Sequence, residues 1–513
     1  MMRVDSDVLV IGSGFGGGLV ATVLSQLGYQ VTVVDKASHP RFAIGESSTP
    51  LADRTLKRIA SRFQLDWLAP LCAYGTAQDL RPHVTVGLKR GFSYFQHSAY
   101  SDFHPRQNRS TELLIAASTD DRIADTHWLR STTDDYIAAK LVDSGVRLIE
   151  NFRVHRIERS EDWVVSGCIA SDAEPTRDRS SVELSARFLI DASGPGSVFA
   201  RDFISSDETS RLKTHTAAVY GHFKELQDWN DLYVRAGGDD QPHPYLSHRA
   251  AVHHLIDEGW VWQLGFDNGV TSCGIVLDRN SLVANPLANG SGEDAWQAIL
   301  RRYPTLQKQF ADAHLVAPSR LVVRERLQFL RSVGAGSQWL ALPSAIGFVD
   351  PLHSTGIAHT LAAVEKIAEM FSRCSQDDPF PSHQSLGAYA DQVRSELLWI
   401  DELVSMCYAA RFDFSLFTAA TLTYFVVVTS AEKDERDGFL SVNHCELVAG
   451  VASVAQRVRD LRKKHESEGT SQDEIRDAVD WIRKTVAPFN QAGLLNPEKQ
   501  NLYHHTAPSD KTV

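Results

Sequence analysis

A glycine-rich turn near the N-terminus carries the first chemical signal. Gly12, Gly14 and Gly17 fit the pattern G-x-G-x-x-G. In this pattern the first glycine permits a tight turn, the second lets a pyrophosphate approach the backbone, and the third allows close helix packing. Asp35 follows 23 residues after Gly12, where a carboxylate can accept hydrogen bonds from ribose hydroxyls. The spacing predicts a dinucleotide site, with Phe15 in the first turn of the helix that follows.

Short elements must position this turn. Residues 7–11 are a β-branched run with apolar side chains on both faces, which is typical of a buried parallel strand. Residues 19–27 have helical apolar spacing and end at Gly28, and residues 29–35 read as a second strand. Residues 188–194 form another buried strand that ends in a glycine turn. The pattern indicates an α/β fold.

Three later segments carry motif-like sequences. Residues 41–50 read RFAIGESSTP, residues 188–194 end in Asp-Ala-Ser-Gly, and residues 347–357 read GFVDPLHSTGI. They resemble the R-x-x-x-G-E-S/A segment, the second FAD-contact strand and the flavin loop of the flavin-dependent halogenases, and of their relatives among the FAD monooxygenases and geranylgeranyl reductases. Arg130 resembles the basic residue that precedes a helix in this group. The chain is identified as a member of the halogenase-like FAD-dependent oxidoreductases, the tryptophan halogenase superfamily.

The resemblance implies an FAD site and the residues that line it. The expected cofactor-binding residues are Gly12, Gly14, Phe15, Gly17, Asp35, Arg41, Gly45, Glu46, Ser47, Arg130, Asp191, Gly194, Ser344, Gly347, Asp350, Ser354, Thr355, Gly356 and Ile357. A second nucleotide fingerprint is absent from the sequence, so reduced flavin is expected from a separate reductase. Pro343-Ser344 replaces the usual Gly-Asp before the flavin loop, which predicts weaker FAD retention.

Lys89 is the first candidate catalytic residue. It matches the position and strand context of the halogenase lysine, and it shares a strand with Gly87, so we expect it to point into space kept open by small side chains. A lysine ammonium can hydrogen-bond hypohalous acid or form a haloamine beside the substrate. The alternative is a solvated strand lysine, since Arg90 is its neighbour.

His353 is the second candidate, because it stands where tryptophan halogenases have Glu in E-S-T-G. An imidazole there could act as a general base or polarise the oxidant, titrating near 6.5 if unperturbed. The alternative is a hydrogen-bonded histidine that lines the flavin loop.

Trp260 and Trp262 are candidate substrate-side residues. The segment WVWQLG resembles the halogenase W-x-W-x-I-P box, with Leu264-Gly265 in place of Ile-Pro. The box is usually read as holding the substrate away from the flavin. The two tryptophans face the same side of a strand, so ordinary core packing is the alternative.

Composition narrows the class of partner. The 513 residues carry a formal charge of −12, which disfavours a nucleic-acid or anionic membrane surface. Six cysteines without a C-x-x-C pair predict free thiols in the cytoplasm. No histidine pattern suggests a metal site, and the apolar stretch 416–428 is shorter than the ~20 residues of a membrane span.

The expected fold class is α/β, with a Rossmann-type FAD-binding domain, an inserted mixed β-sheet substrate domain and a helical C-terminal region, as in halogenases and p-hydroxybenzoate hydroxylase. The expected domain ranges are residues 1–80 with 116–200 and 320–375 for the FAD-binding domain, 81–115 with 201–319 for the substrate-side sheet, and 376–513 for the helical region.

The favoured function is an FAD-dependent halogenase that uses reduced flavin, O2 and chloride or bromide on an indole, phenol or pyrrole type of substrate, either free or bound to a carrier protein. One alternative is a flavin monooxygenase (hydroxylase), favoured by Leu264-Gly265 and His353. A flavin reductase or dehydrogenase on the same scaffold is another, and a non-catalytic flavin-binding protein comes last. No motif selects the substrate, the halide or the oligomeric state.

Overall fold

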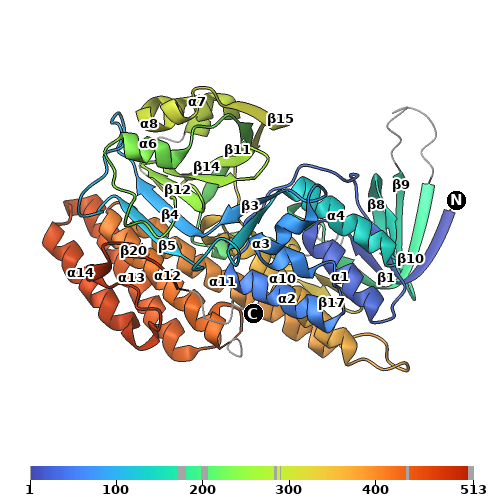
Figure 1. Cartoon of the computed structure of the whole chain (residues 1–513). Coiled ribbons are helices and arrows are strands. Elements are labelled where there is room, and N and C mark those ends of the chain that lie inside the picture. Colours follow the sequence, from blue (N-terminus) through green and yellow to red (C-terminus); the bar gives the residue numbers. More distant parts are fainter. Residues whose placement is uncertain are drawn as a thin grey trace.

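The structure is a computed structural model, and it describes residues 2–169, 181–197, 206–281, 286–288, 290–434 and 438–506. Figure 1 shows two sheets, with helices of the C-terminal part packed beneath the second one. The expected α/β class, with a Rossmann-type domain, a second mixed sheet and a helical C-terminal region, is confirmed.

The first sheet holds the nucleotide-binding motif. Its central strand β1 (Met2–Ile11) pairs in parallel with β2 (Val31–Val34) and β10 (Ser181–Asp191). Parallel strands β7 (Arg147–Ile149) and β18 (Trp339–Ala341) extend it on the two sides. Antiparallel strands β8 (Phe152–Arg159), β9 (Trp163–Ile169) and β17 (Ala335–Gly336) complete it. The βαβ unit expected from the sequence therefore lies at the centre of this sheet.

Four helices belong to the same part of the molecule: α1 (Phe15–Gln26), α2 (Pro50–Arg62), α4 (Arg130–Asp143) and α10 (Thr355–Ser372). Helix α1 begins before the predicted residue 19, because Gly14 ends the preceding turn. Helix α2 begins at Pro50, where the Thr49 side chain accepts a hydrogen bond from the Ala52 N–H. Proline at the first helical position is favourable because its missing N–H would have no partner there.

The second sheet has the strand order β15-β11-β14-β13-β12-β4-β5-β20. These strands are β4 (Gly91–Gln96), β5 (Glu112–Ala116), β11 (Thr216–Lys224), β12 (Ala251–Ile256), β13 (Gly259–Gly265), β14 (Thr271–Asp278), β15 (His314–Arg324) and β20 (Leu502–Tyr503). Pairing is parallel for β12 with β4 and for β20 with β5, and antiparallel elsewhere. Helices α6 (Trp229–Arg235), α7 (Gly292–Arg302) and α8 (Pro304–Gln309) lie on the upper side of this sheet in Figure 1.

Three boundaries differ from the sequence expectation. The predicted limit at residue 319 falls inside β15, which continues to Arg324. Strand β20 belongs to the C-terminal region in sequence but pairs with the second sheet. Strand β3 (Val86–Lys89) pairs with β6 (Asp125–Trp128) in a separate two-stranded ribbon. Long-range pairing sets these boundaries, so local periodicity does not reveal them.

The C-terminal helices are α11 (His383–Ala410), α12 (Phe414–Lys433), α13 (Cys445–Glu468) and α14 (Gln472–Val486). The stretch 416–428 lies inside α12, which is long and apolar enough to cross a membrane by length and composition alone. However, 89% of its apolar window is buried inside the fold, as in the core helix of a globular protein.

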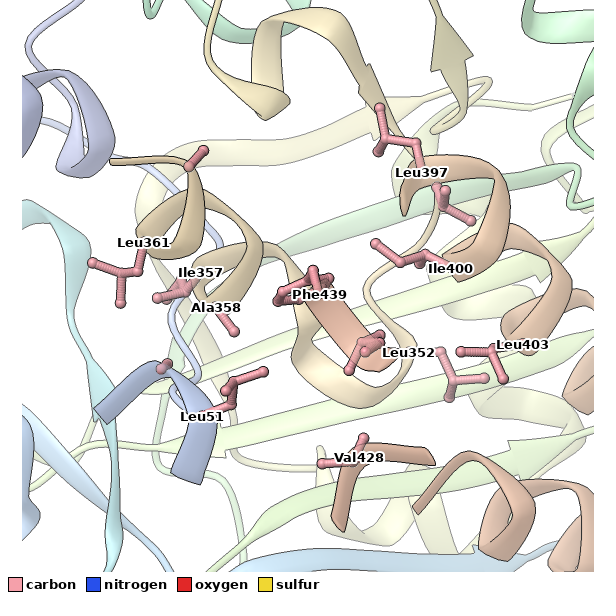
Figure 2. Packing of buried hydrophobic residues seen from close by; sticks show 14 of the residues in the cluster. Leu51, Leu352, Ile357, Ala358, Leu361, Leu397, Ile400, Leu403, Val428 and Phe439 are labelled. Carbon is pink, nitrogen blue, oxygen red and sulfur yellow. The ribbon is translucent and has the colours of Figure 1, made fainter. Parts of the chain in front are cut away.

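The main hydrophobic core joins these helices to the sheets. Figure 2 shows where the turn before α10 packs against α2, α11 and α12. The residues labelled there are Leu51, Leu352, Ile357, Ala358, Leu361, Leu397, Ile400, Leu403, Val428 and Phe439. Full burial of such a side chain contributes ~1.5–3 kcal/mol, so this core holds the flavin-loop segment against the C-terminal helices.

Candidate functional site

Two of the three glycines in the N-terminal motif, Gly12 and Gly17, lie where no other residue fits. Gly12 has φ +109°, and a Cβ there would lie 2.5 Å from the Ala192 carbonyl oxygen. A Cβ on Gly17 would lie 1.9 Å from the Gly12 carbonyl oxygen. Gly14 caps α1 without a side-chain hydrogen bond, so the first N–H groups of the helix stay available to an anion.

Two arginines converge on the same point. A Cβ on Gly14 would lie 3.3 Å from Nη2 of Arg41 and 3.8 Å from Nη2 of Arg130. The Nε of Arg41 is buried and has no hydrogen-bond partner within the described part of the chain. A bare helix N-terminus beside two guanidinium groups is a strong site for a pyrophosphate. The residues present therefore fit the diphosphate of FAD.

Arg130 also builds the wall of this cradle. It forms a bidentate pair with Asp134 at 2.7 and 2.9 Å and donates to the carbonyls of Ile44 and Gly45, both at 3.0 Å. Gly45 has a φ of +88°, a left-handed conformation that glycine adopts without strain because it has no Cβ. Phe15 stacks on Trp128 with ring centroids 5.3 Å apart, which fixes the first turn of α1.

Asp35 lies at the end of β2, as expected. Its Oδ2 accepts hydrogen bonds from the Ser13 N–H and hydroxyl at 2.8 and 2.9 Å and from Arg41 at 3.2 Å, whereas Oδ1 accepts from the Ala37 N–H. Burial opposes ionisation, but the Arg41 charge and these hydrogen bonds outweigh it and lower the pKa of Asp35. The carboxylate is therefore ionised and can accept hydrogen bonds from a ribose.

Glu46 and Ser47 lie between the two sheets. Both are buried, and Nε2 of His222 lies 3.0 Å from Oε1 of Glu46. Ser47 forms an isolated bridge with His127 of β6. Glu46 thus connects the cradle to the second sheet, and Ser47 connects it to the ribbon of β3 and β6.

Asp191 and Gly194 form the turn after β10. The Asp191 carboxylate accepts from the N–H and hydroxyl of Ser193, at 3.0 and 2.5 Å, and from the hydroxyl of Ser197. Burial raises the pKa of Asp191 despite these bonds. Gly194, at φ +70°, has Ser344 as its neighbour.

The segment before α10 has an unusual backbone. His353 and Ser354 both have positive φ, 68° and 59°, a conformation that costs ~1–3 kcal/mol for each such residue. Thr355 is the first residue of α10, and a Cβ on Gly356 would meet open space. Gly356 is exposed, so the first turn of α10 has open space beside it.

Three residues of the expected cofactor set have side chains, or the space for one, in contact with other parts of the protein. A Cβ on Gly347 would lie 2.7 Å from Leu397 of α11, so this glycine permits helix packing. The Ile357 side chain is buried in the hydrophobic core. Asp350 is occupied by donors from Thr216, Tyr408 and the Leu352 N–H. These three residues support the flavin loop through packing and internal hydrogen bonds.

Lys89 is fully buried, which excludes the solvated strand lysine. Its Nζ donates to the Ser48 carbonyl at 2.5 Å and lies 4.0 Å from the centroid of the Phe92 ring. The expectation of open space on the Gly87 face is wrong, since a Cβ there would lie 1.9 Å from the Gly265 carbonyl oxygen. Burial, together with the Lys89 charge, lowers the pKa of His127 to about 3. Lys89 is thus buried beside an aromatic ring, and Asp125 lies opposite it in the register of the β3–β6 pair.

His353 is also fully buried, and both ring nitrogens have partners. The Tyr94 hydroxyl lies 2.9 Å from Nδ1, Sγ of Cys407 lies 3.5 Å from Nε2, and the Tyr424 ring stacks at 4.1 Å. Burial lowers the pKa of His353 well below its ordinary value. The expected titration near 6.5 is therefore wrong, and the histidine is a neutral group that lines the flavin loop.

Trp260 and Trp262 lie on one face of β13 with ring centroids 6.2 Å apart. Nε1 of Trp260 donates to the Tyr408 hydroxyl at 2.7 Å, and Nε1 of Trp262 donates to Ser272 at 3.2 Å. Trp260 stacks on His253 at 4.9 Å, and His253 stacks on Tyr94 at 4.5 Å. The tryptophans therefore continue an aromatic row that ends at the flavin loop.

A small cavity of ≈ 20 Å³ adjoins this row. Its lining residues are Thr49, Pro50, Phe92, Ile115, Ala117, His353, Tyr424, Phe425, Val428, Thr429, Glu432 and Thr506. Phe92 is the residue that the Lys89 ammonium faces, so the cavity and the lysine share one aromatic wall. Within the described residues, no group of three or more His, Cys, Asp or Glu side chains could hold a metal ion.

Sequence reasoning missed Tyr94, His253 and Tyr408. Tyr94 lies on β4 and His253 on β12, and in each strand every second side chain faces the same side. That alternation is the sequence signal that could have placed both residues on the inner face of the sheet. Tyr408 lies on α11, 148 residues after its partner Trp260, and nothing local in the sequence indicates that contact.

Comparisons with known proteins cover most of the chain. The family model for tryptophan halogenases matches residues 129–421, more than half of the chain, and a model for NAD(P)-binding Rossmann-like domains matches residues 10–65. Monodechloroaminopyrrolnitrin halogenase PrnC of Pseudomonas fluorescens is 27% identical over 420 residues, covering 80% of this chain and 69% of that protein. Tetracycline 7-halogenase of Kitasatospora aureofaciens is 29% identical over 423 residues, covering 80% and 71%.

Among solved structures, the halogenase PltM in complex with phloroglucinol and FAD superposes with a TM-score of 0.79 at 20% identity. The match covers 98% of this chain and 100% of that one. The same fold therefore extends through both sheets and the C-terminal helices.

Proposed function

This chain belongs to the tryptophan halogenase family, and from that premise we propose that it halogenates an electron-rich aromatic ring with reduced FAD, dioxygen and chloride or bromide. It is an FAD-dependent enzyme of this family. Bound reduced FAD supplies the oxidising power by activating dioxygen, which turns the halide into hypohalous acid. Every other task falls to the protein.

The cradle around Gly14 binds the cofactor diphosphate. Arg41 and Arg130 donate hydrogen bonds to its oxygens, and Asp35 accepts hydrogen bonds from the adenosine ribose. The turn at His353 and Ser354 directs the α10 N-terminus toward the flavin. These roles follow from the fit of the residues to FAD.

The burial of Lys89 is the single observation that carries the proposed chemistry. Its ammonium donates a hydrogen bond to hypohalous acid and makes the halogen more electrophilic. Alternatively, the amine attacks the halogen, and a haloamine and one water molecule form while the halogen is carried on nitrogen. Phe92 and the other aromatic groups exclude water, which would otherwise disperse the oxidant.

The substrate is an arene of phenol, pyrrole or indole type. Phe92 and Phe425 offer flat walls, and Thr49, Thr429 and Glu432 offer polar groups to a ring hydroxyl or N–H. A cavity of ≈ 20 Å³ holds about one water molecule, so the arene enters by displacing side chains of α12. A separate flavin reductase supplies the reduced cofactor, and the six free cysteines suit the reducing cytoplasm.

Hydroxylation is the second candidate, favoured by Leu264-Gly265 in place of the family's Ile-Pro. One experiment separates the two. The enzyme is incubated with flavin reductase, NADH, FAD, O2 and bromide on a panel of indoles and phenols, and products are analysed by mass spectrometry. Bromine isotope pairs support halogenation, whereas a gain of one oxygen without bromine would establish hydroxylation.

A further inference from the structure

One hydroxyl group connects the tryptophan strand with the flavin loop. The Tyr408 hydroxyl accepts a hydrogen bond from Nε1 of Trp260 at 2.7 Å. The same hydroxyl lies 3.2 and 3.1 Å from the two carboxylate oxygens of Asp350. All three side chains are buried. Helix α11 thus joins β13 to the segment that precedes α10.

The directions of these hydrogen bonds are fixed. An indole N–H only donates, so the Tyr408 oxygen accepts from Trp260 and its own hydrogen is directed at Asp350. The Thr216 hydroxyl has the same arrangement: it accepts from Gln328 Nε2 at 2.6 Å and donates to Asp350 at 2.7 Å. Gln328 is held by donating to the Val349 carbonyl at 2.7 Å. Every described partner of the Asp350 side chain is therefore a donor, which suits an ionised carboxylate.

Protonation of Asp350 conflicts with this arrangement. A neutral carboxylic acid must donate its own proton, and the available acceptors are the Tyr408 and Thr216 oxygens. Whichever hydroxyl accepts must turn its hydrogen away from Asp350. That hydrogen then lacks a partner inside the network, and a buried unsatisfied group is costly.

The charges around Asp350 place the two states close in free energy. Burial raises its pKa to about 7, the donors oppose this shift, and Asp278 of β14 adds to it. Arg411 of α11, whose guanidinium lies over the Tyr408 ring, is paired with Asp278 at 3.2 Å and donates to the carbonyls of Ile256 and Gly259. The Arg411 guanidinium is therefore already bound to residues of the second sheet.

We propose that Tyr408 is a positioning residue that locks Trp260 to the Asp350 turn, and that the lock opens when Asp350 takes up a proton. The ring of Trp260 is stacked on His253, which is stacked on Tyr94, and Tyr94 contacts His353. Trp260 is thus joined to the flavin loop at two points, Asp350 and His353. Opening one of them frees the indole to reorient within the aromatic row of Trp260, His253 and Tyr94. Only the effect of the lock on catalysis rests on the proposed function.

The indole N–H groups report the lock directly. In the 15N-labelled full-length protein with FAD added, the Trp260 indole resonance is assigned by its loss in Trp260→Phe. It should shift with pH with a midpoint of about 7. Trp262, two residues along the same strand and bonded to Ser272, is the internal control and should not follow. A Trp260 resonance that stays constant across this range would overturn the proposal.

Two variants test the residues themselves. Tyr408→Phe and Asp350→Asn should each abolish the Trp260 titration, and Tyr408→Phe should lower the product formed per NADH by about threefold to tenfold, the effect of one lost hydrogen bond. Tyr389→Phe is the matched control: this hydroxyl lies on the same helix and donates to the Ala341 carbonyl at 2.9 Å. It should change neither readout.

Near-ultraviolet circular dichroism checks that each variant is folded. If Tyr408→Phe does not fold, Asp350→Asn alone decides the point. A Trp260 titration that persists in a folded variant of either kind overturns the lock. Absence of halogenated product from a wild-type enzyme whose Trp260 titrates normally would contradict the proposed function and leave the lock intact.

Discussion

The two ends of the site are built in opposite ways. At the nucleotide end, Gly12 and Gly14 leave backbone groups bare, and two arginines hold positive charge beside them. At the halogenation end, Lys89 is fully buried beside the Phe92 ring, and burial together with the Lys89 charge lowers the pKa of His127 and His253. The first end attracts an anion through charge and missing side chains. The second end controls reactivity by excluding water, so mutations should act differently at the two places.

The largest effect is expected at Lys89. Lys89→Met keeps the apolar stem but removes the cation, so product formation should fall at least about a hundredfold, the usual contribution of a positioned proton donor. NADH consumption and peroxide release should continue, because flavin oxidation precedes this step. Both are measured in the same reaction. Full product formation by a folded Lys89→Met would show that the buried lysine is structural.

Gly14→Val should weaken FAD binding at the nucleotide end and leave the surroundings of Lys89 unchanged. A Cβ at Gly14 already lies 3.3 Å from Arg41, so a branched side chain should displace both the guanidinium and the diphosphate. The Kd for FAD, measured by titration of the apoprotein, should rise by about a hundredfold, equivalent to two lost charge-assisted hydrogen bonds. Gly387→Ala is the control, because a Cβ there in α11 meets open space. Unchanged flavin content in Gly14→Val would contradict the diphosphate site.

The buried histidines predict a pH dependence of stability. Burial lowers the pKa of His127, His253 and His254 to about 3. Since the unfolded chain protonates near 6.5, their stabilising contribution is complete above that pH and decreases as pH falls toward 3. Each of these histidines should lower the free energy of unfolding by ~1.4 kcal/mol for every pH unit below about 6.

Thermal unfolding between pH 7.5 and pH 5 measures this dependence. His253→Phe should flatten the decrease in Tm, because phenylalanine has no proton to take up. His383→Asn, at the exposed start of α11, should leave the slope as in the wild type. Equal slopes of Tm against pH in the wild type and both variants would show that His253 does not contribute to the pH dependence of stability.

The smallest effect is expected at Ser344. Ser344→Asp restores the carboxylate that the family usually places before the flavin loop, and it should tighten FAD binding by about threefold to tenfold through one charged hydrogen bond. The exposed Ser467→Asp, at the end of α13, controls for added charge. Weaker binding in Ser344→Asp would mean that repulsion from the buried Asp191 dominates.

The same contrast explains what could be predicted from the sequence. The turn at Gly12 to Gly17 is local, so spacing alone indicates its geometry and its ligand class. Lys89 could be found by its motif, but its burial depends on Ser48 and Phe92, which come from other elements. The pKa of His353 does not follow from its motif, because burial lowers it most and the neighbouring His253 of β12 adds to the shift. Long-range packing decides protonation, and a single sequence does not display it.

Strand β20 has a consequence for how the chain is made. Its residues Leu502 and Tyr503 pair with Leu114 and Ile115 of β5, and Thr506 donates to the Ala116 carbonyl 390 residues earlier in the chain. At ~5–20 residues per second, a ribosome needs about 20 to 80 s to synthesise that interval. Throughout this time the edge of β5 has unpaired N–H and C=O groups, the usual template for aggregation between chains. The nascent polypeptide is therefore vulnerable until β20 has been made, and a chaperone on that edge should raise its soluble yield.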